Sequence, residues 1–175
     1  MSMTKEEHVR RETRPLLIEV HAAGVCIRRQ PQTTEVLLAK RAKDRELFPG
    51  KIESCGGQVP PSLSFQDAVA YHFREEMGIE VHVVGSLCLP YTIQHKGLII
   101  PGIRFLCLHK HGEPSSKNHE WVKWVPIDKL AFIPPSDFAG DMSASASALI
   151  GSWHALVNKL SREELSVALQ PQTED

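Results

Sequence analysis

The chain has 175 residues, of which 42% are hydrophobic and 23% are charged, and its formal net charge at pH 7 is -1. This length suits one domain with a sizeable core, and the balanced charge argues against DNA, RNA or an anionic membrane surface as the main partner. Because the first residues are charged and no later apolar run is long enough to span a membrane, we expect a soluble, cytoplasmic protein.

The order of segments along the chain predicts a charged N-terminal tail over residues 1–14, a single domain over residues 15–169 and a C-terminal tail over residues 170–175. The four cysteines show no C-x-x-C spacing and lie in or beside apolar runs, so we expect reduced thiols in the core. These cysteines are Cys26, Cys55, Cys88 and Cys107.

Five segments rich in apolar and β-branched residues have the character of strands. They are residues 16–27, 35–38, 80–89, 98–108 and 121–125. The turn-prone sequence RRQPQTT between the first two predicts a hairpin or a long β-connection. Pro101 and Gly102 interrupt the fourth segment and predict a sheet edge or a bulge there, and the whole set predicts a mixed sheet.

Residues 56–81 predict a glycine turn, a capped helix and a following strand. Ser64 and Asp67 have the form of a capping box, which places the start of the helix near Phe65. Gly78 suits the left-handed residue that ends a helix. We therefore expect a helix of about three and a half turns in this segment.

Ionisable side chains of this helix face inward. At about 100° per residue, His72 and Glu76 fall within the apolar arc and Glu75 lies at its edge. A buried carboxylate needs a positive or hydrogen-bonding partner, and a divalent cation would satisfy both glutamates. Carboxylate and carbonyl oxygens suit Mg²⁺ or Mn²⁺, and the turn at Gly56 and Gly57 lets a bare carbonyl approach such an ion. The alternative is that the glutamates are surface charges and that His72 and Glu76 form a simple i,i+4 pair.

Residues 141–169 show large apolar side chains at helical spacing. We expect this second helix to pack against the sheet, which gives helices on both faces of it. The predicted fold class is therefore α/β, as a three-layer α/β/α sandwich with a central mixed β-sheet.

The frame from residue 57 to residue 79 resembles the Nudix box of diphosphate hydrolases, written G-x5-E-x7-R-E-U-x-E-E-x-G-U. The residues that match it are Gly57, Phe73, Glu75, Glu76, Gly78 and Ile79. The residues that depart from it are Leu63 at the first Glu, Tyr71 at the Arg and His72 at the Glu after that Arg. The flanking segments also resemble this fold, so that the resemblance covers roughly residues 16–133.

This resemblance implies metal-dependent hydrolysis of a diphosphate linkage in a nucleoside diphosphate derivative, with Mg²⁺ or Mn²⁺ as the cofactor and a small-molecule diphosphate as the partner. Glu75, Glu76 and the carbonyl of Gly57 would hold the ion, which neutralises diphosphate oxygens and helps to generate hydroxide. Glu76 also counts among the catalytic candidates. The role of His72 stays open: it is a metal ligand, a general base or a core histidine that is hydrogen-bonded to a neighbour.

Nudix enzymes often take their base from a glutamate outside the box, and His119 and Glu120 are the candidates here, with Glu120 preferred. Trp121 is expected either to stack on a nucleobase or to pack against neighbours. Phosphate contacts are expected from basic residues on or beside the predicted strands, namely Arg28, Lys40, Arg41, Lys51 and Arg104.

Two further functions stay open. A Nudix-fold sensor would bind a nucleotide or metabolite without turnover, which the changes in the box permit. An enzyme similar to isopentenyl diphosphate isomerase would use Cys55 and His21, although Cys55 lies one residue too early relative to Gly57. The sequence also leaves a homodimer open.

Overall fold

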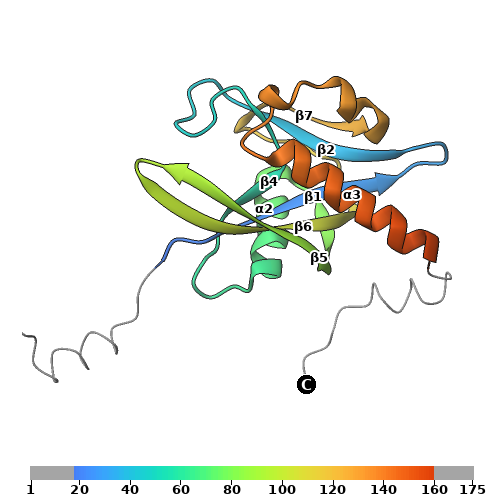
Figure 1. Ribbon diagram of the computed structural model, residues 1–175, viewed down its shortest axis with the longest axis horizontal. Helices are drawn as coiled ribbons and strands as arrows, with labels where there is room; N and C mark the ends of the chain where they lie inside the picture. The colour runs from blue at the N-terminus through green and yellow to red at the C-terminus, as the bar shows by residue number, and fades with distance from the viewer. Residues whose placement is uncertain (1–17, 160–175) are drawn as a thin grey trace, which may run out of the picture.

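The computed structural model describes residues 18–159 of the chain (Figure 1). The predicted tails and residues 160–169 of the predicted last helix lie outside the described residues. One mixed sheet forms the centre, with strand order β3-β2-β1-β6-β5, β4 paired to β1 and β7 paired to β2. Its strands are β1 (His21–Arg29), β2 (Thr34–Arg41), β3 (Ile52–Glu53), β4 (Cys55–Gln58), β5 (Glu80–His95), β6 (Leu98–His111) and β7 (His119–Pro126).

The two α-helices of the described residues cover opposite faces of the sheet. They are α2 (Phe65–Met77) and α3 (Met142–Lys159), and two short 3-10 helices, η1 (Ile127–Phe132) and η2 (Pro135–Asp137), precede α3. Because side chains alternate along a strand, Ala22 and Cys26 of β1 join the core cluster under α2, whereas Val25 and Ile27 join the cluster under α3. In Figure 1, α3 crosses in front of the strands and α2 lies behind them. The predicted α/β/α sandwich is confirmed.

The capping signals of α2 act as predicted. The Ser64 hydroxyl oxygen accepts from the backbone N–H of Asp67 at 3.1 Å, which satisfies one of the free donors at the start of the helix. Gly78 ends the helix with φ 68° and ψ 19°, in the left-handed region that favours glycine. The helix thus begins at Phe65 and ends at Met77, as the sequence predicted.

The hairpin of β1 and β2 is confirmed, and β5 and β6 form a second, longer hairpin than predicted. Within β6, pairing with β1 begins at Gly102, so Pro101 lies where one side of the strand is an edge. The register shifts of this hairpin lie between Glu80 and Val81 and between Val84 and Cys88 of β5 instead. Of the two features predicted at Pro101, the edge is therefore correct and the bulge is wrong.

Three of the four cysteines are buried free thiols, but the prediction of a core position is wrong for Cys88, which is exposed on β5. Burial raises the pKa of Cys26, Cys55 and Cys107 well above the usual value, and the neighbouring Glu76 raises the pKa of Cys55 further. These three side chains are therefore neutral packing groups. Neither α-helix of residues 18–159 has the length and apolar character needed to cross a membrane.

The sheet is forked along β1, and this fork positions the candidate site. The first half of β1, from His21 to Gly24, pairs with β4, whereas its end, from Ile27 to Arg29, pairs with β2. Ser54 carries the chain from β3 on one branch to β4 on the other. The two branches of the sheet therefore separate at the level of Glu53 and the glycines of β4.

Candidate active site

A cleft of about 610 Å³ lies beside this fork, between the start of β1, the loop of residues 42–50, β3 and β4, β5 and β6, and the start of α3. The backbone of Gly56 and Gly57 forms part of its wall. Its charged lining residues are Arg41, Asp44, Arg45, Glu46, Glu53, Arg104 and Asp141. A polar cleft of this size can hold a nucleotide-sized molecule.

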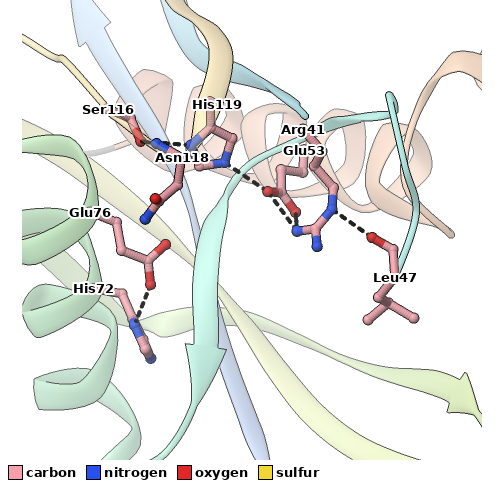
Figure 2. Close-up of polar contacts among 8 residues, drawn as sticks. All are labelled: Arg41, Leu47, Glu53, His72, Glu76, Ser116, Asn118 and His119. Carbon is pink, nitrogen blue, oxygen red and sulfur yellow. Dashed lines mark hydrogen bonds and ion pairs between the residues drawn. The ribbon is translucent and has the colours of Figure 1, made fainter. Parts of the chain in front are cut away.

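Glu53 is held at the cleft wall by two cationic or hydrogen-bonding partners (Figure 2). Arg41 donates from one Nη1 to both carboxylate oxygens, at 2.7 and 2.8 Å, and its Nε donates to the Leu47 carbonyl at 2.7 Å. His119 contacts Glu53 Oε1 through Nε2 at 2.8 Å, and its Nδ1 lies 2.8 Å from the Ser116 hydroxyl. Arg41 thus lines the cleft, and it fixes Glu53 and the loop of residues 42–50; its role in substrate binding stays a prediction.

His72 and Glu76 form a second polar pair, on α2. The side chain of His72 is 11% exposed, and its Nδ1 lies 2.9 Å from Glu76 Oε1 while its Nε2 lies 3.0 Å from the Gln58 carbonyl. A carboxylate and a carbonyl only accept hydrogen bonds, so this arrangement suits a ring that donates from both nitrogens, as an imidazolium does. The bond to Glu76 raises the pKa of His72 against the opposing effect of burial, and the Gln58 carbonyl adds to the rise.

In its protonated form the ring has no lone pair for a metal ion or for a proton from water. The geometry therefore favours a positioning role for His72: it holds the Glu76 carboxylate. The ring also explains Gly57, because a Cβ built there would lie 2.7 Å from the imidazole Cε1. Glycine at this position lets the ring pack against the backbone that forms the cleft wall.

The carboxylates predicted as metal ligands are unequally placed. The Glu75 side chain is 53% exposed and lies 3.3 Å from Arg74 Nε, whereas the Glu76 side chain is 33% exposed. Figure 2 shows Glu76 pointing from α2 toward Asn118 and His119 at the start of β7. Within residues 18–159, no group of three or more His, Cys, Asp or Glu side chains is gathered to hold a metal ion.

The carboxylates of Glu75 and Glu76 and the backbone of Gly57 still fit a hard divalent cation such as Mg²⁺. Mg²⁺ keeps several waters and is commonly bound by one or two carboxylates together with the phosphates of a substrate. Glu76 Oε2 has no hydrogen-bond partner among the described residues, so this oxygen is available. The donor set therefore suits an ion whose coordination a bound diphosphate completes.

Glu120, predicted as a general base, lies outside the cleft lining. Its carboxylate is 3.3 Å from Lys40 Nζ, so these two predicted residues neutralise each other. A register shift between Lys40 and Arg41 places His119 opposite Arg41 and leaves Glu120 without a strand partner on β2. As a result His119, and not Glu120, reaches the cleft-lining carboxylate Glu53.

The remaining predicted substrate-binding residues divide between structural contacts and the cleft. Arg28 donates to Glu35 at 2.7 Å and lies over the Trp124 ring, and Lys51 donates to the Ser136 carbonyl at 2.7 Å. Trp121 packs against the core cluster under α3, with Lys123 over its ring. These three lie outside the cleft lining, whereas Arg104 lies within it.

Several cleft residues carry no signal of a functional role in the sequence. Glu53 has none, because β3 has only two residues and shows no periodicity. Tyr91 lies beyond residue 89, where the predicted strand ends, but β5 continues to His95. Asp141 stands at the start of the predicted last helix, yet nothing local indicates that it faces Arg104.

Cys55 and His21, the residues expected of an isomerase, are kept apart. Cys55 is 2% exposed and belongs to the core cluster under α2, whereas His21 lines the cleft and bonds Glu19 at 2.8 Å. A thiol in that core has no access to a substrate in the cleft. The arrangement therefore gives the isomerase hypothesis no support.

A family model described as NUDIX domain matches residues 19–145. The NAD-capped RNA hydrolase NudC of Stutzerimonas stutzeri (strain A1501) is 30% identical over 105 residues, which cover 57% of this chain and 35% of that protein. The chain thus spans about a third of the length of this relative.

Solved structures share the fold at low identity. An Ap4A hydrolase of C. elegans, in a binary complex, has a TM-score of 0.65 at 17% identity. The match covers 82% of this chain and 100% of that one. The NUDIX domain of Shewanella oneidensis NrtR, complexed with ADP ribose, has a TM-score of 0.63 at 15% identity, with 99% of its chain and 86% of this one covered.

Proposed function

The chain belongs to the NUDIX domain family. From this premise we propose that it is a hydrolase of the Nudix type, which cleaves a diphosphate linkage in a nucleoside diphosphate derivative with the help of a divalent metal ion. The observation that carries the proposal is the shared wall at Gly57. One side of this backbone lines the cleft, and the other side packs against His72, which holds Glu76.

The similar proteins support a substrate of this class. Their names give NAD-capped RNA, Ap4A and ADP ribose, and each of these molecules contains a nucleoside joined through phosphoanhydride bonds to a further group. The cleft volume of about 610 Å³ suits a small molecule of this kind.

We assign Glu75 and Glu76 as ligands of Mg²⁺ or Mn²⁺, with the backbone of Gly57 beside them. The bound ion would neutralise diphosphate oxygens and lower the pKa of a water molecule. His72 fixes the carboxylate of Glu76 through its Nδ1–H, which limits the motion of that ligand. Arg41 supplies guanidinium donors to phosphate oxygens from the cleft lining.

A panel of nucleoside diphosphate derivatives with Mg²⁺ or Mn²⁺ tests this function, with phosphate measured after phosphatase treatment of the products. We expect turnover of at least one compound and a loss of about a hundredfold or more in kcat for Glu76→Gln. Glu80→Gln is the matched control, because Glu80 is an exposed residue at the start of β5. Equal turnover by Glu76→Gln and wild type would remove Glu76 from the mechanism.

A sensor that binds a nucleotide without turnover is the second candidate. The observation that favours it is the imidazolium of His72, which stands where the box has a glutamate and donates from both ring nitrogens. Such a protein would be stabilised against heat by a nucleotide ligand and would release no product. The cytoplasmic location and the homodimer stay predictions.

A further inference from the structure

One corner of the cleft, where β5, β6 and the start of α3 meet, contains polar groups that the hydrolysis does not use. Arg104 is 6% exposed, and its Nη1 donates to Asp141 Oδ1 at 2.9 Å. The guanidinium lies 4.4 Å from the centre of the Tyr91 ring. Ser145 supports the corner from α3 by donating to Asp141 Oδ2 at 3.2 Å.

These groups have donors and acceptors that are not used within the described part of the chain. Arg104 Nε is buried without a partner, and a guanidinium with one carboxylate on Nη1 still offers donors from Nη2. No bond to the Tyr91 hydroxyl occurs within the described part of the chain. Burial raises the pKa of Tyr91 to about 12, so this hydroxyl is a neutral donor and acceptor at physiological pH. The Asp141 side chain is 52% exposed and has lone pairs free to accept.

The charge of the whole cleft limits what this corner can bind. Three arginines of the lining face four carboxylates, so the cleft has no excess of positive charge. A diphosphate with one divalent ion is close to neutral and fits this balance. A chain of four phosphates brings more negative charge, which would meet the carboxylates of Asp44 and Asp141.

We infer that Tyr91, Arg104 and Asp141 form a subsite for an uncharged, hydroxyl-rich group, so that the preferred substrates are nucleoside diphosphate sugars rather than dinucleoside polyphosphates. Sugar hydroxyls both donate and accept: they donate to Asp141 and accept from Arg104 and Tyr91. This inference rests on the proposed function, because it names the group X of a nucleoside diphosphate derivative.

Calorimetry with two non-hydrolysable ligands tests the subsite in the presence of Mg²⁺. The ligands are α,β-methylene ADP-ribose and α,β-methylene ADP, which differ by the sugar beyond the diphosphate. We expect the wild-type protein to bind the ribose compound about tenfold more tightly, since each hydrogen bond that reaches a charged group adds appreciably to affinity. The dinucleoside tetraphosphate Ap4A should bind more weakly than the ribose compound.

Two variants assign the difference to named groups. Asp141→Asn should lower the affinity for the ribose compound about tenfold, and Tyr91→Phe about fivefold, while the affinity for α,β-methylene ADP stays within about twofold. Asp137→Asn is the matched control, because Asp137 lies on η2 outside the cleft lining. Tyr91→Phe keeps the ring under Arg104, so it tests the subsite even where Asp141→Asn fails to fold.

The inference is overturned if both variants weaken the two ligands equally, if neither weakens the ribose compound, or if Ap4A binds more tightly than it. Failure of the proposed function looks different: no derivative would be hydrolysed, although the ribose compound would still bind with dependence on Asp141 and Tyr91. Hydrolysis that is insensitive to both variants would leave the function standing and remove the subsite.

Discussion

Replacing His72 with glutamate removes the imidazolium that holds Glu76 and puts a carboxylate beside it. The side chain of His72 is 11% exposed and bonds both Glu76 Oε1 and the Gln58 carbonyl. A glutamate there restores the residue type of the Nudix box, but in the absence of metal it faces two acceptors and donates to neither. We therefore expect His72→Glu to destabilise the metal-free protein and to improve its binding of a divalent cation.

The size of the effect follows from the two lost bonds. Removing one partner of a buried ion pair costs about 3–5 kcal/mol. Because the Glu76 side chain is 33% exposed and water can reach it, we expect the lower end, about 3 kcal/mol. With a third carboxylate present, Mn²⁺ at about 100 times its Kd would return about 2.7 kcal/mol to the folded state.

Urea unfolding at neutral pH, followed by tryptophan fluorescence, measures this free energy with EDTA and with Mn²⁺. His72→Gln is the matched control, because its amide can donate to the Gln58 carbonyl but adds no carboxylate. We expect Mn²⁺ to stabilise His72→Glu much more than His72→Gln or the wild-type protein. Equal stabilisation of the two variants would refute the placement of the metal at this end of α2.

Three further predictions concern pH, thiols and the cleft wall. The bond to Glu76 raises the pKa of His72 above 6.5, so the stability that this bond contributes is full below pH 6.5 and is lost as the pH rises through the raised pKa. Melting temperatures across this range should show the loss in the wild-type protein and not in His72→Gln. A thiol reagent should modify Cys88 in the native protein and all four cysteines in denaturant, and Cys88→Ser should abolish the native reaction. Glu53→Gln should lower the free energy of unfolding by about 2–3 kcal/mol, because the largely buried guanidinium of Arg41 loses its carboxylate partner. An unchanged midpoint of urea unfolding would contradict this prediction.

The helix α2 could be predicted from the sequence because its signals are local. The cap at Ser64 and the left-handed Gly78 fix its two ends, and helical periodicity places His72 and Glu76 on its inner face. The two helix-covered faces of the sheet were predicted from the helical spacing of large apolar residues in residues 141–169, which is also a local pattern. These features depend on neighbours within a few residues.

The cleft could not be predicted in the same way, because it depends on pairing between distant segments. Glu53 meets His119 across 66 positions of the chain, and Arg104 meets Asp141 across 37. The register shift at Lys40 turns Glu120 away from the cleft, and no residue pattern announces it. Which carboxylate a basic side chain meets also depends on the folded sheet. Arg28, predicted to contact phosphate, therefore donates to Glu35 instead.

Paramagnetic broadening by Mn²⁺ tests the central claim most directly, since the ion broadens the NMR signals of the residues nearest to it. With ¹⁵N-labelled protein and α,β-methylene ADP-ribose present, the amide signals of Gly57, Glu75 and Glu76 should broaden first as Mn²⁺ is added. Broadening should need more Mn²⁺ without the ligand, because the diphosphate completes the coordination. Early loss of the signals of Asp44 and Glu46 with those of α2 unchanged would place the ion in the cleft, away from α2, and contradict the account.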